Sequence, residues 1–386
     1  MPSSEFIPYG RQAISDADVA AVVEVLRSDY LTQGPVVPRF ESELVNHCGA
    51  AYAVAVNSAT SALHLACLAL GLGPGDELWT TPNTFVASAN CGRYCGARVD
   101  FVDIDPRSYN LSAERLAEKL EQAAELGRRP KVLVAVHFAG QACDMRAIHE
   151  LAKRYDFAVI EDASHALGGF YEGAPIGSGS YSDITIFSFH PVKIITTGEG
   201  GMALTQRVDL AERMASLRSH GITRDPAKLD RESEGPWYYQ QVELGFNYRM
   251  TDFQAALGLS QLGRLTEFIA ARERLADRYD RLLADFAVTL PWRAPSCRPA
   301  WHLYVVLLPE AKRKRVFEAM RAQGIGVNVH YIPVHLQPDY RRLGFAKGDF
   351  PESERYYDAA LTLPLFPTLT DTGQDRVVEA LGVALR

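Results

Sequence analysis

The chain has 386 residues, a length that suits two or three domains, or one large domain with a smaller appendage. Hydrophobic residues make up 47% and charged residues 23%, which is the usual balance of a globular protein and excludes disorder as its main state. The formal net charge of −7 is opposite in sign to the basic surface that nucleic acid or anionic lipid generally requires. Neither a nucleic acid nor a membrane is therefore an expected partner.

The sequence shows no membrane-spanning or export segment. No run approaches the ~18 consecutive apolar residues of a membrane-spanning helix. The first residues lack a basic segment followed by an apolar one, so we expect a cytoplasmic protein. The six cysteines are too sparse for a disulfide scaffold and lack the spacing of zinc or redox motifs. We interpret them as reduced structural thiols and expect no metal site.

Short apolar runs alternate with helical patterns between residue 51 and about residue 250. Residues 51–56 predict a buried strand, residues 58–61 a polar turn, and residues 63–70 a helix that ends at the following glycines. Such alternation is typical of a mostly parallel sheet with helices on both faces, where ligands bind at the carboxyl ends of the strands. Further strands are predicted at residues 78–81, 99–102, 132–136, 158–160 and 184–189.

The pattern changes near residue 250, where we predict the boundary between a large domain with an N-terminal arm (1–250) and a smaller C-terminal α+β domain (251–386). A long helical pattern covers residues 252–286. A strand at 302–308, a helix at 313–323 and a strand at 327–332 follow it. Residues 224–236 are charged and contain glycine and proline, so we expect a mobile loop there.

Lys193 is the first residue that could carry chemistry. It follows the apolar strand at 184–189, where an ammonium group is costly unless it is paired or neutralised. Forming a Schiff base is one way to remove the charge. The alternative is a strand-end lysine that reaches water through its flexible stem. Only the neighbouring residues separate these two interpretations.

Two distant segments offer groups that bind a phosphate. The start of the first helix presents the amides of Ala59 and Thr60 and the Thr60 hydroxyl, and helix N-termini favour anions. Ser188 lies at the end of the strand before Lys193, where its hydroxyl could reach the same anion. The alternative for residues 58–61 is an ordinary helix N-cap.

Asp162 and His165 follow the strand at 158–160, at the sheet edge that also carries Lys193. A carboxylate there can pair with the protonated ring nitrogen of pyridoxal phosphate (PLP) and keep the ring an electron sink, and His165 could bond the ring oxygen. Phe85 follows another strand at this edge and could stack on a flat ring, with core packing as its alternative. A capping Asp with a loop His, or an Asp–His pair for metal or acid–base chemistry, are the other interpretations.

Six blocks in order along the chain resemble the PLP-dependent nucleotide-sugar aminotransferases of fold type I, the DegT/DnrJ/EryC1/StrS type. The resemblance covers nearly the whole chain and implies PLP, or its amino form PMP, as cofactor. It also implies an α/β fold with a mostly parallel, seven-stranded sheet in the large domain. The blocks are residues 31–34, 57–65, 162–168, 188–201, 245–252 and 329–333.

The resemblance implies a role for each candidate residue. Lys193 would form the Schiff base with PLP and Asp162 would pair with the pyridine nitrogen, as the two catalytic residues. His165 would lie near the ring hydroxyl, although many members have Gln there, and Phe85 would stack on the ring. The phosphate would be held by Ala59, Thr60 and Ser188, with Asn247 of the partner subunit completing each site of a homodimer.

The nucleotide-sugar substrate needs its own contacts. Arg218, His220, Arg224 and Arg249 are candidate cations for the diphosphate, and surface salt bridges are the alternative for the first three. The residues expected to contact the sugar are Tyr9, Thr32, Glu199, Arg249, His330 and Tyr331.

Within the family, His165 and the segments 6–9, 194–197 and 217–221 most resemble the 4-aminotransferases of pseudaminic acid biosynthesis. These enzymes move the amino group of L-glutamate to C4 of UDP-2-acetamido-2,6-dideoxy-β-L-arabino-hexos-4-ulose. Enzymes that make 4-amino-arabinose, perosamine or bacillosamine precursors share most of the blocks and stay alternatives.

Three further alternatives differ in chemistry. A related dehydratase branch carries His in place of the Schiff-base lysine, so the presence of Lys193 favours transamination. A non-catalytic PLP-binding sensor would bind the sugar nucleotide without turning it over. An aminotransferase that acts on amino acids alone would usually need an arginine for a second carboxylate, and no motif identifies one.

Overall fold

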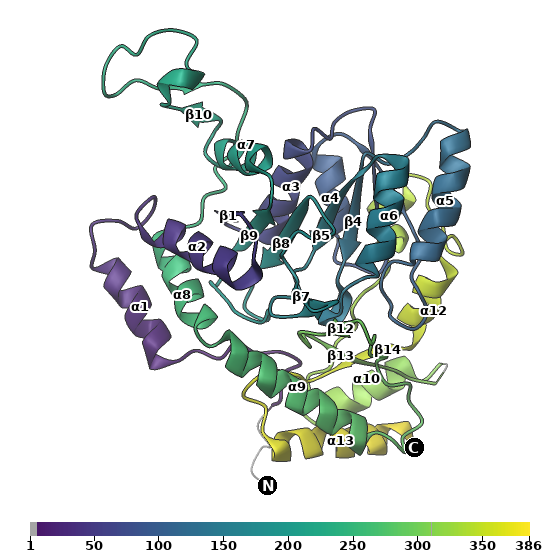
Figure 1. The fold of residues 1–386 in the computed structure, drawn as a ribbon. Helices are drawn as coiled ribbons and strands as arrows, with labels where there is room; N and C mark the ends of the chain where they lie inside the picture. The colour runs from purple at the N-terminus through teal and green to yellow at the C-terminus, as the bar shows by residue number, and fades with distance from the viewer. Residues whose placement is uncertain (1–5, 310) are drawn as a thin grey trace.

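The computed structural model describes residues 6–309 and 311–386, and a seven-stranded sheet forms its centre (Figure 1). The strand order is β1-β9-β8-β5-β4-β2-β3, and all neighbours are parallel except for β9, which runs antiparallel to β1 and β8. The predicted mostly parallel, seven-stranded sheet is confirmed. The strands are β1 (Tyr52–Val56), β2 (Glu77–Thr80), β3 (Arg98–Phe101), β4 (Val132–Val136), β5 (Ala158–Asp162), β8 (Ile184–Ser188) and β9 (Gly201–Thr205).

The side chains of each strand alternate between two hydrophobic cores, one on each face of the sheet. On β4, Val132, Val134 and Val136 enter one core, whereas Leu133 and Ala135 enter the other. Helices cover both faces, which buries most of the apolar side chains of the strands. The first core is covered by α3 (Ala59–Ala69), α4 (Ala87–Tyr94) and α7 (Val208–Arg218), and the second by α2 (Val36–Cys48), α5 (Ala113–Glu125) and α6 (Met145–Tyr155).

The C-terminal part has a third core, which lies below the sheet in Figure 1. Its two strands, β13 (Tyr304–Leu307) and β14 (Ala360–Leu363), are antiparallel. Helix α9 joins this core to the main one, since Phe268 packs into the sheet's core and Tyr279 into the third core. The domain boundary near residue 250 stays a prediction. The helices of this part are α8 (Asp252–Leu262), α9 (Leu265–Leu282), α10 (Arg313–Ala322), α11 (Pro338–Arg341), α12 (Pro351–Ala359) and α13 (Asp371–Leu385).

One prediction for this part was right only in part, and another was wrong. The segment at 252–286 is mostly helical as predicted, but it forms two helices, because α8 ends at Leu262, just before Gly263, a residue of low helix propensity, and α9 starts at Leu265. The predicted strand at 327–332 forms only one isolated bridge, between Asn328 and Thr362. Its alternating side chains resemble a strand in sequence, but the segment turns toward the cavity described below.

An arm projects away from the body of the molecule beyond α7 (Figure 1). The predicted mobile loop at 224–236 lies within it and contains a short 3-10 turn at Pro226–Lys228, while its mobility stays a prediction. No helix in the described ranges is long and apolar enough to cross a membrane, and the cytoplasmic location stays a prediction. The remaining elements are α1 (Asp16–Leu26), β6 (Phe170–Tyr171), β7 (Ala174–Pro175), β10 (Ile222–Thr223), β11 (Gln240–Gln241) and β12 (Cys297–Arg298).

Candidate active site

A cavity of about 500 Å³ lies at the carboxyl ends of β1, β5 and β8, where the sequence predicted a ligand site. Its volume is within the range of small-molecule and cofactor sites. The predicted residues that line it are Tyr9, Ala59, Thr60, Phe85, Asp162, His165, Ser188, Lys193, Glu199, His330 and Tyr331.

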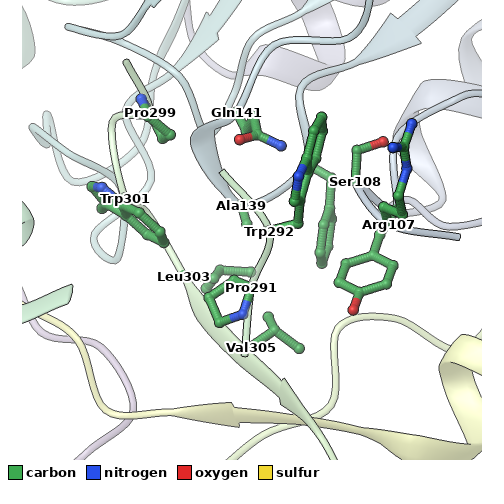
Figure 2. A pocket seen from close by; sticks show the side chains of 12 residues that line it. Arg107, Ser108, Ala139, Gln141, Pro291, Trp292, Pro299, Trp301, Leu303 and Val305 are labelled. Carbon is green, nitrogen blue, oxygen red and sulfur yellow. The ribbon is translucent and has the colours of Figure 1, made fainter. Parts of the chain in front are cut away.

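A second cavity lies nearby but is too small for a cofactor. It measures about 30 Å³, and Ala139 is one of the residues that line it (Figure 2). The amide of Ala139 also donates a hydrogen bond to His165, which lines the larger cavity. Trp292 and Trp301 form part of its wall, and the Arg107 guanidinium lies 5.0 Å from the Trp292 ring centroid. A space of this size holds about one or two water molecules, so the larger cavity is the candidate site.

Three predicted residues lie outside the cavity in the single chain. Thr32 pairs with Thr251 and Arg249 with Val56 through isolated bridges, and Asn247 is exposed. The candidate diphosphate residue Arg218 is also elsewhere: its Nη1 lies 2.7 Å from the Glu41 carboxylate.

One end of the cavity is built to bind an anion. Ser58 caps α3 by accepting a hydrogen bond from the Ser61 amide at 3.1 Å, which confirms the N-cap interpretation for that residue. The amides of Ala59 and Thr60 belong to the first turn of α3 and so have no partner within the helix. Ser188 reaches the same place, because it pairs in register with Gly201, whose backbone lies against Ala59. The start of α3 and the end of β8, which are distant in sequence, therefore meet at this end of the cavity.

Asp162 lines the same cavity and is buried at the end of β5. Its Oδ1 accepts hydrogen bonds from the hydroxyl and the amide of Ser164, at 2.6 and 3.2 Å. Its Oδ2 accepts a hydrogen bond from the Ser88 hydroxyl at 2.6 Å. Donors on both oxygens therefore hold this carboxylate in place in the wall of the cavity.

Lys193 lies in the turn after β8 and lines the cavity together with Phe85. Burial lowers the pKa of the Lys193 amine to about 8, against an opposing, smaller effect of the Asp162 charge. The Phe85 side chain is 59% exposed in the single chain, which argues against the core-packing interpretation. An amine, a carboxylate and an aromatic ring therefore face one space.

Three buried histidines line the cavity side by side. The His165 Nδ1 accepts a hydrogen bond from the Ala139 amide at 3.3 Å, so the ring proton lies on Nε2, which donates to the Tyr331 hydroxyl at 3.1 Å. Burial holds the pKa of His165 well below its usual value and lowers that of His330 to about 3, so both rings are neutral near neutral pH. The His302 ring lies 4.3 Å from that of His165, centroid to centroid.

Ser88, His302 and Asn328 line the cavity but were not among the predicted site residues. The His302 Nδ1 is buried and has no hydrogen-bond partner among the described residues. A buried polar atom without a partner costs free energy, which a bound molecule or water can offset. No sequence motif marks these three positions, since each enters the site through a tertiary contact.

The arrangement fits PLP. The helix N-terminus and Ser188 suit a phosphate, Asp162 suits a protonated ring nitrogen, and Lys193 suits an aldehyde. Phe85 supplies a flat apolar surface for the ring. Phosphate-binding groups, an amine and a carboxylate around one cavity are typical of a PLP-dependent enzyme.

Comparison with known proteins specifies the class. The chain belongs to the DegT/DnrJ/EryC1/StrS aminotransferase family, whose model matches residues 12–382. It is 38% identical to the UDP-4-amino-4-deoxy-L-arabinose–oxoglutarate aminotransferase of Shewanella sediminis, over 98% of each chain. It is 40% identical to the GDP-perosamine synthase of Caulobacter vibrioides, over 94% of each chain.

Solved structures agree. PseC of Helicobacter pylori, an aminotransferase involved in the biosynthesis of pseudoaminic acid, matches with a TM-score of 0.90 and 30% identity over 99% of each chain. Spr1654 of Streptococcus pneumoniae, a proposed sugar aminotransferase solved with PLP, matches with a TM-score of 0.90 and 30% identity over 98% of each chain. The predicted family, fold type, cofactor and enzyme class are confirmed: the chain is a PLP-dependent nucleotide-sugar aminotransferase.

Proposed function

We propose that this enzyme transfers the amino group of L-glutamate to C4 of UDP-2-acetamido-2,6-dideoxy-β-L-arabino-hexos-4-ulose, a UDP-4-keto-6-deoxy-HexNAc, in pseudaminic acid biosynthesis. The main support is the end-to-end structural match to PseC, together with the family blocks around His165 and residues 217–221. The alternative is a 4-amino-arabinose, perosamine or bacillosamine type of transfer. Two relatives that are 38% and 40% identical to this chain, against 30% for PseC, favour the first two of these types.

PLP bound in the cavity supplies an electron sink for the negative charge that forms when the amino acid loses its Cα proton. Lys193 would hold the cofactor, and its freed side chain would accept that proton as a neutral amine and return it as an ammonium group. Its pKa of about 8 leaves an appreciable neutral fraction near neutral pH, as a general base needs. Asp162 would keep the ring nitrogen protonated, Phe85 would cover the ring, and the amides of α3 with Ser188 would anchor the phosphate.

We place the sugar in the part of the cavity lined by Tyr9, His330, Tyr331 and Glu199. Tyr9 and His330 pack together with ring centroids 5.3 Å apart. Because His165 donates its Nε2 proton to the Tyr331 oxygen, the Tyr331 hydroxyl proton is free to point at a substrate oxygen. These groups suit a ligand rich in hydroxyl and carbonyl groups.

We infer a homodimer with shared active sites. Asn247, a predicted phosphate ligand, lies outside the cavity of its own chain, and the arm nearby exposes large apolar side chains. Trp237 is 70% exposed and Leu244 is 80% exposed, and exposed apolar groups of this size are typical of protein contacts. The partner's Asn247 would then reach the phosphate end of the cavity.

Mixed dimers test this sharing. Lys193→Ala and Asn247→Ala variants should each be impaired alone, and mixing them after subunit exchange should restore activity. One site of the mixed dimer then combines an intact lysine with an intact asparagine from the other chain. No restoration, with exchange verified by mass spectrometry, would contradict shared sites.

The substrate is tested with a panel of UDP-, GDP- and dTDP-4-keto sugars and L-glutamate, read by product mass. We expect amination of the UDP-4-keto-6-deoxy-HexNAc at C4, and preference for a pentose or a GDP-sugar would favour the 4-amino-arabinose or the perosamine type. Glutamate alone should convert bound PLP to PMP, which changes its absorbance. A sensor would show no such change, and Lys193→Ala provides the control without turnover.

A further inference from the structure

The Asp162 carboxylate is held unequally at its two oxygens. Each carboxylate oxygen offers about two lone-pair sites. Oδ1 uses both, because it accepts from the Ser164 hydroxyl and from the Ser164 amide. Oδ2 accepts only from the Ser88 hydroxyl among the described residues, which leaves it one acceptor site.

Ser88 is itself held by a second hydroxyl. The Thr84 Oγ1 lies 2.8 Å from the Ser88 Oγ. Ser88 gives its only hydroxyl proton to Asp162, so Thr84 is the donor in this pair. Thr84 and Ser88 are 3% and 1% exposed, so water does not compete for these bonds. A chain of hydroxyl donors therefore ends on one chosen oxygen of Asp162, and each bond polarises the next.

The two serines that hold Asp162 come from different parts of the fold. Ser164 follows Asp162 by two residues and would bond it locally in any similar turn. Ser88 lies in the first turn of α4, which covers the same face of the sheet as Ile160 of β5. It comes three residues after Phe85, so one segment carries both the aromatic ring and the hydroxyl. Tertiary packing thus sets the orientation of Oδ2.

We propose that Ser88 is a positioning residue that holds Asp162 so that Oδ2, and not Oδ1, receives the N–H of the PLP pyridine ring. This deepens the proposed role of Asp162 and rests on it. A hydrogen bond to a charged carboxylate is stronger than a neutral one and stabilises the ionised form. Without Ser88, Oδ2 loses its one donor among the described residues and is held less firmly toward the ring, so the ring nitrogen is protonated less of the time.

The test is nitrogen NMR of the holoenzyme loaded with PLP labelled at its ring nitrogen, since this resonance separates the protonated from the neutral ring. In Ser88→Ala at neutral pH, we expect the resonance to move toward the neutral position. The glutamate half-reaction should slow roughly tenfold in single turnover. A folded Ser88→Ala protein with an unmoved resonance would overturn the proposal.

Two further variants sharpen the result. Ser164→Ala removes one donor to Oδ1 but keeps the residue 164 amide, so it should move the resonance less than Ser88→Ala does. An equal or larger movement would overturn the assignment to Oδ2. Thr84→Val removes the donor to Ser88 with little change in shape, and it decides the question if Ser88→Ala does not fold. We expect a smaller movement in the same direction, and none would count against the proposal.

The same spectrum separates this proposal from the one on which it rests. If the wild-type ring nitrogen is already neutral, the role of Asp162 itself fails. If it is protonated in the wild type and in folded Ser88→Ala alike, only the positioning role of Ser88 fails.

Discussion

Gly201 lies directly against the first turn of α3, where a Cβ at residue 201 would stand 2.5 Å from the Ala59 nitrogen. Packed side chains do not approach backbone so closely, and backbone atoms cannot rotate away. Gly201 also pairs in register with Ser188 on one side and with Val56 on the other. The missing side chain at this position therefore allows both halves of the anion-binding end to meet.

Gly201→Ala should push α3 away from β9 and weaken the binding of PLP at its phosphate. We expect at least roughly tenfold weaker PLP binding and a loss of about 1–3 kcal/mol in the free energy of unfolding, as overpacked sites generally show. Absorbance titration of the apoprotein and urea unfolding measure the two effects. Gly73→Ala is the control, since a Cβ there meets nothing within 4 Å. Wild-type affinity in Gly201→Ala would contradict this explanation.

Strands buried on both faces were the easiest elements to predict from sequence. The run at β4 is apolar throughout, because both its faces enter a core. The antiparallel strand β9 was not predicted, because its first residue is Gly201, and glycines in sequence indicate a turn. Its place between β1 and β8 depends on packing against α3, which local sequence does not show.

The site residues also divide into those that local sequence marks and those that only tertiary packing brings to the site. Asp162 and Lys193 were found because each lies at the end of a buried apolar strand, where polar groups stand out. Ser88 and His302 were missed because their partners, Asp162 and His165, are far away in sequence. A hydroxyl in a helix's first turn and a histidine before a strand have many ordinary explanations. Only their tertiary contacts distinguish these two residues from other serines and histidines of the chain.

The pKa of Lys193 predicts how the apoprotein binds PLP. Only a neutral amine attacks the aldehyde, and burial lowers the pKa of Lys193 from 10.5 to about 8 by disfavouring the ammonium. The rate of covalent attachment should therefore rise with pH and level off above about 8. Stopped-flow absorbance measures this rate. A midpoint near the pKa of an ordinary lysine, about 10.4, would refute the prediction.

Asp162→Asn tests the direction in which the Asp162 charge shifts the pKa of Lys193. The negative charge of Asp162 raises the pKa of Lys193, so its removal should lower that pKa further. The midpoint of the attachment rate should then move to lower pH. A movement to higher pH would show that Asp162 does not act on the amine through its charge.

Arg272 is predicted to hold the turn that carries His302. It is 1% exposed, and its Nη1 donates to the backbone oxygens of Trp301, His302 and Leu365 at 3.2, 3.3 and 3.0 Å. Arg272→Lys shortens the reach and removes the planar donor group, so we expect a loss of about 1–3 kcal/mol in urea unfolding. Arg298→Lys, in an exposed ion pair with Glu273, should change stability by less than about 1 kcal/mol. Equal effects of the two variants would contradict a special role for Arg272.

Arg218 is expected to stabilise the fold rather than to bind the nucleotide. Its Nη1 lies 2.7 Å from both the Glu41 carboxylate and the Ala55 carbonyl oxygen, and the Ala55 amide donates to the same carboxylate at 2.7 Å. Arg218→Ala leaves Glu41 largely buried without its cation, so we expect about 2–4 kcal/mol lower stability and an unchanged KM for the sugar nucleotide. Arg224→Ala is the matched comparison, because Arg224 is exposed on the arm and is also a predicted contact of the diphosphate. Arg224→Ala should raise KM and leave urea unfolding unchanged. A raised KM without loss of stability in Arg218→Ala, and lower stability with an unchanged KM in Arg224→Ala, would contradict the structural role of Arg218.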